Sequence, residues 1–119
     1  MDHITEKLKF HYYCADLIDR FNHADNSEKM KITEIFPFAD DEYIVKSETR
    51  SAYLAGVVEE LCRRDNIRIP KWVNEDKYFL SRPMFGGGLE NIKSFLIVES
   101  PVGFRRRNIF VSKNAIVRV

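Results

Sequence analysis

The sequence predicts an all-α protein: a single, mostly helical domain over residues 1–119, with short extended segments. Its 119 residues, 45% of them apolar, are enough for one hydrophobic core without disulfides or metals. Two long stretches, 3–22 and 47–64, repeat apolar residues at helical spacing. Runs of β-branched residues are short, and the chain contains no internal repeat. We therefore expect helices packed on helices, with only small extended pieces between them.

Residues 3–22 form the first predicted helix. Steps of three and four define one apolar stripe that we expect to be buried, made of Ile4, Leu8, Tyr12, Ala15, Ile18 and either Phe21 or Asn22. The solvated face then consists of Glu6, Lys7, Lys9, Asp16, Asp19 and Arg20. This is the pattern of a helix that lies on the surface of a core.

Two short helices are expected next. Asp25, followed three residues later by Glu28, resembles a capping box, and Pro37 ends the helix that it starts. The apolar residues of this helix are Met30, Ile35 and Phe36. The acidic cluster 40–42 predicts a further turn through 43–45, because negative charge is favourable at a helix N-terminus.

The second long helix begins at a cap formed by Ser47 or Thr49 and ends at Arg63 and Arg64, cations suited to a helix C-terminus. Its strong apolar face is Leu54, Val57, Val58, Leu61 and Cys62. Asp65 and Asn66 follow as a break in the helical pattern.

Residues 67–73 alternate as an extended connector, with Pro70 suited to an exposed edge and Trp72 as an anchor. A turn is expected at 75–80. A helix is expected from Leu89 to about residue 99, after a flexible stretch that ends in three glycines.

The segment 99–112 combines a helix start, three arginines and an apolar run. Ser100 is the predicted N-cap and Pro101 the first helical position of a short helix through Arg107. Successive side chains of a helix are about 100° apart, so the three arginines cannot all face the same way, and at least one should pack or pair inside the fold. Short strands at 109–111 and 116–119, or a last turn capped by Ser112, complete the chain.

Charge is unevenly distributed along the chain. The formal net charge is only +1, which argues against a general attraction to nucleic acid or to an anionic membrane. Residues 1–89 carry 13 Lys+Arg against 16 Asp+Glu, whereas residues 90–119 carry 6 against 2. The basic character therefore belongs to the C-terminal quarter.

No stretch approaches the roughly 18 apolar residues of a membrane span, and the first residues lack the apolar core of a secretory signal. We therefore expect a cytoplasmic protein without a membrane partner. Cys14 and Cys62, which lie in no CxxC or CxxH pattern, are expected to be reduced thiols.

Motifs for catalysis or cofactors are weak. The run 86–88 has the backbone freedom of a phosphate loop but lacks its signature, so a plain mobile loop is the favoured interpretation. His3, His11 and His23 are not spaced to meet on one helix face as a metal site. We predict no catalytic residue, no cofactor and no metal, and hence a protein that is not an enzyme.

The candidate partner-binding residues are basic: Arg105, Arg106, Arg107, Lys113 and Arg118. Guanidinium groups fork onto carboxylates or phosphates, and Phe104 and Phe110 add aromatic surface nearby. Structural or protein-interface pairing is the favoured interpretation, because the upstream acids need partners. Nucleic-acid contact is the alternative.

Three stretches resemble a family of small bacterial proteins and C-terminal modules. They are residues 52–55 with 60–61, residues 70–73, and residues 99–112, which read ESPVGFRRRNIFVS. The family is associated with helix-turn-helix regulators and with nucleotidyltransferase-like toxin genes. The resemblance implies a regulatory or antitoxin-like module in a toxin–antitoxin or phage-defence setting, which binds a protein partner, with a toxin as one candidate. Residues 1–48 do not match a helix-turn-helix with a basic recognition helix, which weakens the case for sequence-specific DNA binding.

Overall fold

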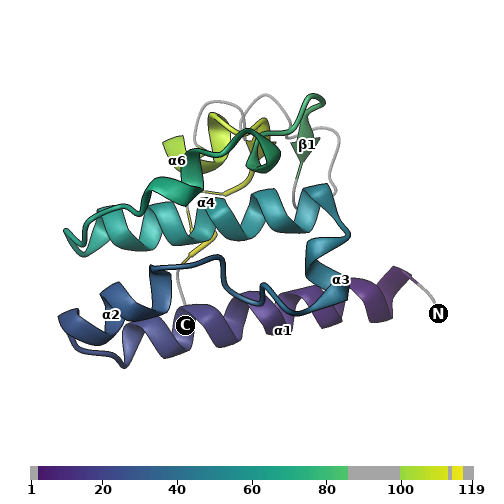
Figure 1. Cartoon of the computed structure of the whole chain (residues 1–119). Coiled ribbons are helices and arrows are strands. Elements are labelled where there is room, and N and C mark those ends of the chain that lie inside the picture. Colours follow the sequence, from purple (N-terminus) through teal and green to yellow (C-terminus); the bar gives the residue numbers. More distant parts are fainter. Residues whose placement is uncertain (1–2, 86–99, 113, 117–119) are drawn as a thin grey trace.

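The helix α4 (Glu48–Arg64) occupies the middle of three layers in the computed structural model, which describes residues 3–85, 100–112 and 114–116. Figure 1 shows it between a layer that contains α1 (His3–Asn22), α2 (Asn26–Thr33) and α3 (Glu42–Val45) and a layer that contains α6 (Val102–Arg105). A helix covered on two sides has apolar residues around most of its circumference. Accordingly, nearly all of α4 from Ser51 to Cys62 is buried. The prediction of an all-α fold is confirmed.

The helix starts predicted in the first half of the chain are confirmed. An Asp25 carboxylate oxygen accepts a hydrogen bond from the backbone N–H of Glu28 at 2.9 Å. Asp41 accepts from the N–H of Tyr43 at 2.9 Å, and Ser47 Oγ accepts from the N–H of Arg50 at 3.1 Å. Each bond satisfies a backbone donor that a helix leaves free in its first turn.

The buried face of α1 differs in part from the predicted stripe. Ala15, Ile18 and Phe21 are buried as expected. Leu8 is 49% exposed and Tyr12 67% exposed, whereas Leu17, outside the stripe, is fully buried. The inward positions of the first half of the helix belong to Phe10, whose ring lies 5.5 Å from that of Tyr53, and to Tyr13. Both inward-facing and outward-facing aromatic residues fit a helical repeat, so spacing alone could not decide between them.

The connector after α4 crosses the top layer as two 3₁₀ turns, η1 (Lys71–Asn74) and η2 (Asp76–Tyr78), and the short strand β1 (Met84–Phe85). The predicted extended connector therefore ends at Pro70, and a turn replaces its last residues. The turn predicted at 75–80 is confirmed by η2. Trp72 is an anchor as predicted: its Nε1–H donates to the carbonyl of Thr33 at 2.8 Å.

The C-terminal segment returns to β1. The strand β2 (Ile109–Phe110) pairs in parallel with β1, with Met84 opposite Ile109, and confirms the predicted strand at 109–111. The predicted N-cap at Ser100 is wrong, because its hydroxyl is used elsewhere: it donates to the carbonyl of Val111 at 3.0 Å and accepts from the N–H of Val111 at 2.9 Å. The helix is also shorter than predicted, since α6 ends at Arg105 and a turn follows.

Other predictions fall at the end of the chain or outside the described residues. Ser112 begins a turn, as its Oγ accepts from the N–H of Asn114 at 3.1 Å. The helix predicted from Leu89, the glycine run 86–88 and most of the strand at 116–119 lie outside the described residues. Within the ranges that the structure describes, no helix has the length and apolar character needed to cross a membrane.

Candidate interaction groove and the arginine clamp

The three consecutive arginines have different environments. Arg107 is 0% exposed and is the largest fully buried side chain, whereas Arg105 and Arg106 are exposed. The prediction that at least one arginine pairs inside the fold is therefore confirmed. Lys113 and Arg118 lie outside the described residues.

Arg107 is held by a carboxylate of α4. Its Nη1 donates to Glu59 Oε1 at 2.6 Å and to the carbonyl of Gly103 at 2.6 Å, and its Nη2 donates to the carbonyl of Val73. The guanidinium carbon of Arg107 lies 4.8 Å from the ring centre of Phe79, and Nε of Arg107 is buried without a hydrogen-bond partner. The whole guanidinium group is thus enclosed by protein atoms.

Glu59, itself 3% exposed, also pairs with two other arginines. Arg106 Nε donates to Oε1 of Glu59 at 3.1 Å, and an Arg63 Nη2 donates to Oε2. Burial opposes the ionisation of Glu59, but the hydrogen bonds and charges of Arg107 and Arg106 outweigh it and hold the pKa of this carboxyl below its usual range. We call Glu59, Arg63, Arg106 and Arg107 the arginine clamp.

Two glycines bring α6 close to α4 beside the clamp. A Cβ on Gly56 would lie 2.7 Å from Cδ1 of Phe104, and a Cβ on Gly103 would lie 2.7 Å from Oε2 of Glu60. The N–H of Gly103 uses this proximity to donate to Glu60 Oε2 at 2.9 Å. The clamp and the glycines together fasten α6 to the central helix.

These contacts favour a structural role for part of the predicted site. Arg107 has no surface left for a partner, and Arg106 also donates to Asn74 and lies over Phe79 at 5.0 Å from the ring centre. Arg105 is the member of the triplet that is exposed and outside the clamp.

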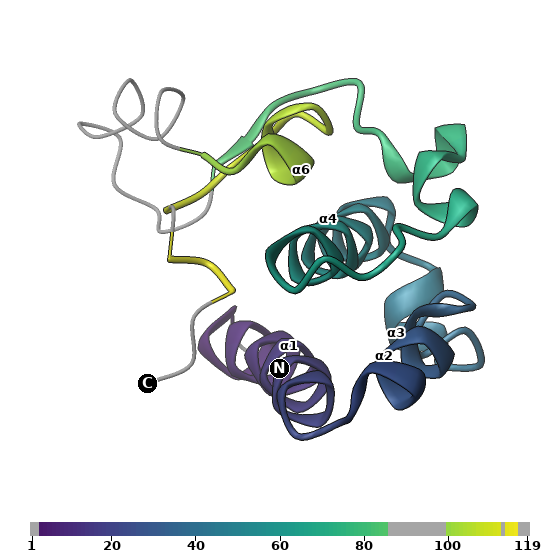
Figure 2. The same cartoon turned by 90° about the vertical axis from the view of Figure 1, so that its left-hand side faces the viewer.

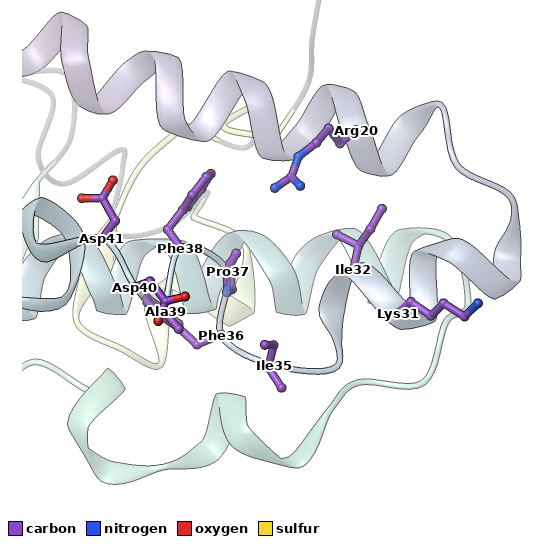
Figure 3. A pocket seen from close by; sticks show the side chains of 10 residues that line it. All are labelled: Arg20, Lys31, Ile32, Ile35, Phe36, Pro37, Phe38, Ala39, Asp40 and Asp41. Atoms are coloured by element: carbon purple, nitrogen blue, oxygen red, sulfur yellow. The ribbon is translucent and has the colours of Figure 1, made fainter.

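A groove opens on the other side of the molecule, between α1, the end of α2 and the segment that follows it. Figure 3 shows the side chains around it, and its volume is about 570 Å³, within the range of pockets that hold small molecules. We call this feature the groove. Its lining residues are Arg20, Lys31, Ile32, Ile35, Phe36, Pro37, Phe38, Ala39, Asp40 and Asp41.

The chain forms the groove by leaving the helix early. α2 ends at Thr33, and Pro37 cannot continue a helix because it has no N–H and restricts the residue before it. Phe38 then adopts a positive φ of 61°, a conformation that costs a bulky L-residue about 1–2 kcal/mol. Its ring stays in place by packing at 87° against that of Tyr13, 4.9 Å between centres.

The apolar part of the groove combines a supported floor with an exposed wall. Phe36 stacks on Tyr78 at 5.2 Å and meets Trp72 edge-on at 5.5 Å, so two other aromatic rings hold it in place. Ile35 is 68% exposed, the highest value among the large apolar residues of the described chain. Ile35 and the neighbouring ring of Phe36 thus offer apolar surface that a partner can cover.

Charges of opposite sign lie at the two ends of the groove. Figure 3 shows Arg20 and Lys31 toward the α2 end and Asp40 and Asp41 toward the α3 end. Arg20 pairs with Asp16 at 3.1 Å, and Asp41 accepts a hydrogen bond from the hydroxyl of Tyr13. That bond lowers the pKa of Asp41.

Lys31 and Asp40 differ from these two residues. Among the residues that the structure describes, neither side chain has a hydrogen-bond or ion-pair partner. One unpaired cation and one unpaired carboxylate thus flank an apolar centre.

Sequence reasoning missed the groove. The sequence pattern placed Ile35 and Phe36 on the apolar face of a helix, which was wrong. The apolar run 35–39, between the charges of Glu34 and Asp40, argued against a helix there, because five consecutive apolar residues cannot all lie on one helix face. The run predicts an irregular apolar segment, but its distance from α1 cannot be read from the sequence.

The chain was compared with known protein families, curated proteins and solved structures. No protein-family model, no curated protein and no solved structure matches the chain.

Within residues 3–85, 100–112 and 114–116, no three His, Cys, Asp or Glu side chains are grouped as metal ligands would be. Cys14 and Cys62 are free thiols, and burial raises the pKa of Cys14 to about 12, which makes it a poor nucleophile near neutral pH.

Proposed function

We propose that this protein is a non-enzymatic interaction or regulatory module, which binds a partner protein in the groove. One observation carries the proposal: the exposed Ile35 lies in a groove that is also lined by Lys31 and Asp40, two charges that have no partner among the described residues. Such a surface loses water-exposed apolar area when a partner covers it, and its charges select the orientation of that partner. The resemblance of residues 99–112 to modules found beside toxin genes makes a toxin the first partner to test.

The proposal places the partner away from the arginine segment. Arg107 and Arg106 are committed to Glu59, so that a protein contact made by both would have to break the clamp first. Removing one member of a buried ion pair costs about 3–5 kcal/mol, which a partner would have to supply. Ile35, by contrast, is exposed before any partner arrives.

Site-specific photo-crosslinking in the native host tests the proposal. A photoreactive phenylalanine analogue replaces Ile35, and a matched control replaces Val102, which is 40% exposed on α6 in the opposite layer. We expect a covalent adduct from position 35 and none with the same protein from position 102. The adduct is identified by mass spectrometry, and the captured protein is then purified and titrated.

Titration decides between the two surfaces. We expect Ile35→Ser to weaken the purified complex at least tenfold and Arg105→Glu to leave it unchanged. An adduct formed only from position 102, or a complex weakened by Arg105→Glu and not by Ile35→Ser, would overturn the groove as the binding site.

The second candidate is a nucleic-acid-binding regulator that uses the basic C-terminal segment. The observation in its favour is that Arg105 and Arg106 are both exposed on α6 and the turn after it. Against it, Glu59 and Glu60 lie beside the same helix and offset its charge. Retention of DNA or RNA that falls steeply with salt and disappears when Arg105, Lys113 and Arg118 become alanine would support it. Absence of retention at low salt would exclude it.

A further inference from the structure

The backbone beside the groove has unused hydrogen-bonding groups. The chain leaves α2 at Thr33, and residues 34–36 belong to no helix or strand. The N–H groups of Ile35 and Phe36 have no partner among the described residues. Amides left unpaired in an irregular segment are able to pair with the backbone of a second, extended chain.

The side chains around these amides define what such a chain would carry. Ile35 and the ring of Phe36 offer an apolar contact at the centre. Lys31 lies at the α2 end with its amine pointing outward in Figure 3 and attracts a carboxylate there, and Asp40 attracts a cation toward the α3 end. Arg20 adds a second positive charge at the α2 end, and Asp41 adds a second negative charge at the α3 end. Arg20 is already paired with Asp16, and Asp41 already accepts a hydrogen bond from Tyr13.

We propose that the groove binds an extended peptide segment of the partner, with an apolar residue at its centre, an acidic residue toward Lys31 and a basic residue toward Asp40. This inference rests on the proposed function and specifies the chemistry of the occupant. Such a segment would cover Ile35, pair with the backbone amides of residues 35 and 36, and neutralise the charges of Lys31 and Asp40.

The contributions to binding are unequal. An exposed ion pair changes an affinity by less than about tenfold, so the charges set direction and specificity more than affinity. Burial of apolar surface is the larger contribution, and Ile35 has the most exposed surface among the large apolar residues described, which makes it the main source of affinity. Removing Ile35 should therefore weaken binding at least tenfold, and reversing a charge should change the preferred peptide.

Selection from a display library of random 12-residue peptides tests the inference on the full chain. Four proteins are used as targets: the wild type, Ile35→Asp, Lys31→Glu and Asp40→Lys. All three substituted residues are exposed, so each variant should fold, which circular dichroism and thermal melting verify. Selected peptides are resynthesised, and their affinities are measured by fluorescence polarisation.

We expect the wild type to enrich peptides with an apolar centre, an acid on one side and a base on the other. These peptides should bind Ile35→Asp at least tenfold more weakly. Lys31→Glu should enrich peptides with bases on both sides, and Asp40→Lys peptides with acids on both sides, because each reversal changes the preference at one end only.

Several results would overturn the inference. They are no enrichment on the wild type, peptides that bind Ile35→Asp equally well, or a charge pattern that is the same on all four targets. Enrichment of apolar residues at spacings of three and four would indicate a helical occupant and would overturn the extended conformation. If these results accompanied a crosslinked partner at position 35, the groove would remain the interface and only the peptide chemistry would be wrong.

Discussion

The arginine clamp joins α4 to the turn after α6, whereas the groove lies on the other side of α4, beside α1 and α2 (Figure 2). Both features combine charged and aromatic side chains. In the clamp Glu59 and Arg107 are buried, and the carboxylate of Glu59 receives hydrogen bonds from three arginines. In the groove the central apolar residue is exposed, and Lys31 and Asp40 have no partner among the described residues. Charged and aromatic residues thus stabilise the fold in the clamp, whereas in the groove they remain available for a partner. The comparison predicts that clamp substitutions change stability, whereas groove substitutions change binding.

The largest effect is expected at Glu59. Glu59→Gln removes the charge opposite Arg107, which is 0% exposed and has no access to water. We expect the free energy of unfolding to fall by about 3–5 kcal/mol, because a buried charge is left uncompensated. Chemical denaturation measures the change. Glu75→Gln, on the exposed face of the connector, is the matched control and should stay within about 0.5 kcal/mol. Equal stability of both variants would show that the clamp does not hold the fold.

The next effect concerns the glycine contact beside the clamp. Gly56→Ala places a methyl group against the buried ring of Phe104, where a Cβ would lie 2.7 Å away. Overpacking of this kind costs about 1–3 kcal/mol, and the better helix propensity of alanine returns up to about 1 kcal/mol. We therefore expect a net loss of about 1–2 kcal/mol in denaturant unfolding. The variant Phe104→Leu tests whether the loss is steric. In a protein that carries Phe104→Leu, Gly56→Ala should lower the free energy of unfolding by less than in the wild type. An equal loss in both backgrounds would refute a steric origin.

A smaller effect is expected from pH. Asp65 accepts hydrogen bonds from Arg64 at 2.8 Å and pairs with Lys29 at 3.1 Å, and mainly the Arg64 bond lowers the pKa of Asp65 to about 2. The pKa is lower in the folded than in the unfolded chain, so this contribution is present above about pH 4 and is lost as the pH falls toward 2. Arg107 and Arg106 likewise lower the pKa of Glu59, so its contribution to stability is also lost as the pH falls.

The pH dependence has a measurable signature. We expect Asp65→Asn to lower the free energy of unfolding at pH 7 by about 1 kcal/mol, after allowance for solvent screening, and by less at pH 2.5. Urea unfolding at several pH values measures the slope. Asp76→Asn, an exposed residue, is the control and should leave the slope unchanged. A slope that Asp65→Asn does not reduce would contradict the assignment.

The smallest change in stability is expected in the groove. Ile35 is 68% exposed, so Ile35→Ser removes little buried area and should alter the free energy of unfolding by less than about 0.5 kcal/mol. A loss of partner binding without a loss of stability would separate the two regions most sharply. A fall in melting temperature as large as that of Glu59→Gln would remove the distinction between them.

Local signals in the sequence predicted the helices well. The caps at Asp25, Asp41 and Ser47 act on backbone donors two or three residues away, so their effect is visible in a short stretch of chain. The apolar face of α4 was also predicted, because a helix buried on two sides leaves little ambiguity. The cap at Ser100 failed because a partner 11 residues away, Val111, takes its hydroxyl.

The site could be predicted only in part. The three arginines indicated that at least one pairs inside the fold, but nothing local names Glu59, which lies 48 residues before Arg107. The groove depends on how α1, which contributes Arg20, lies beside the end of α2 and the segment that follows it. Contacts between distant segments decide both features, and no periodicity within a helix encodes them.

The position of Trp72 has a practical consequence. It is the single tryptophan of the chain, its indole N–H is bound to the carbonyl of Thr33, and its ring meets Phe36, a lining residue of the groove. Indole emission responds to hydrogen bonding and to polarity, so occupation of the groove should change the fluorescence of the unmodified protein. The molecule therefore contains a native optical probe beneath its candidate recognition surface, and ligands can be screened without a label.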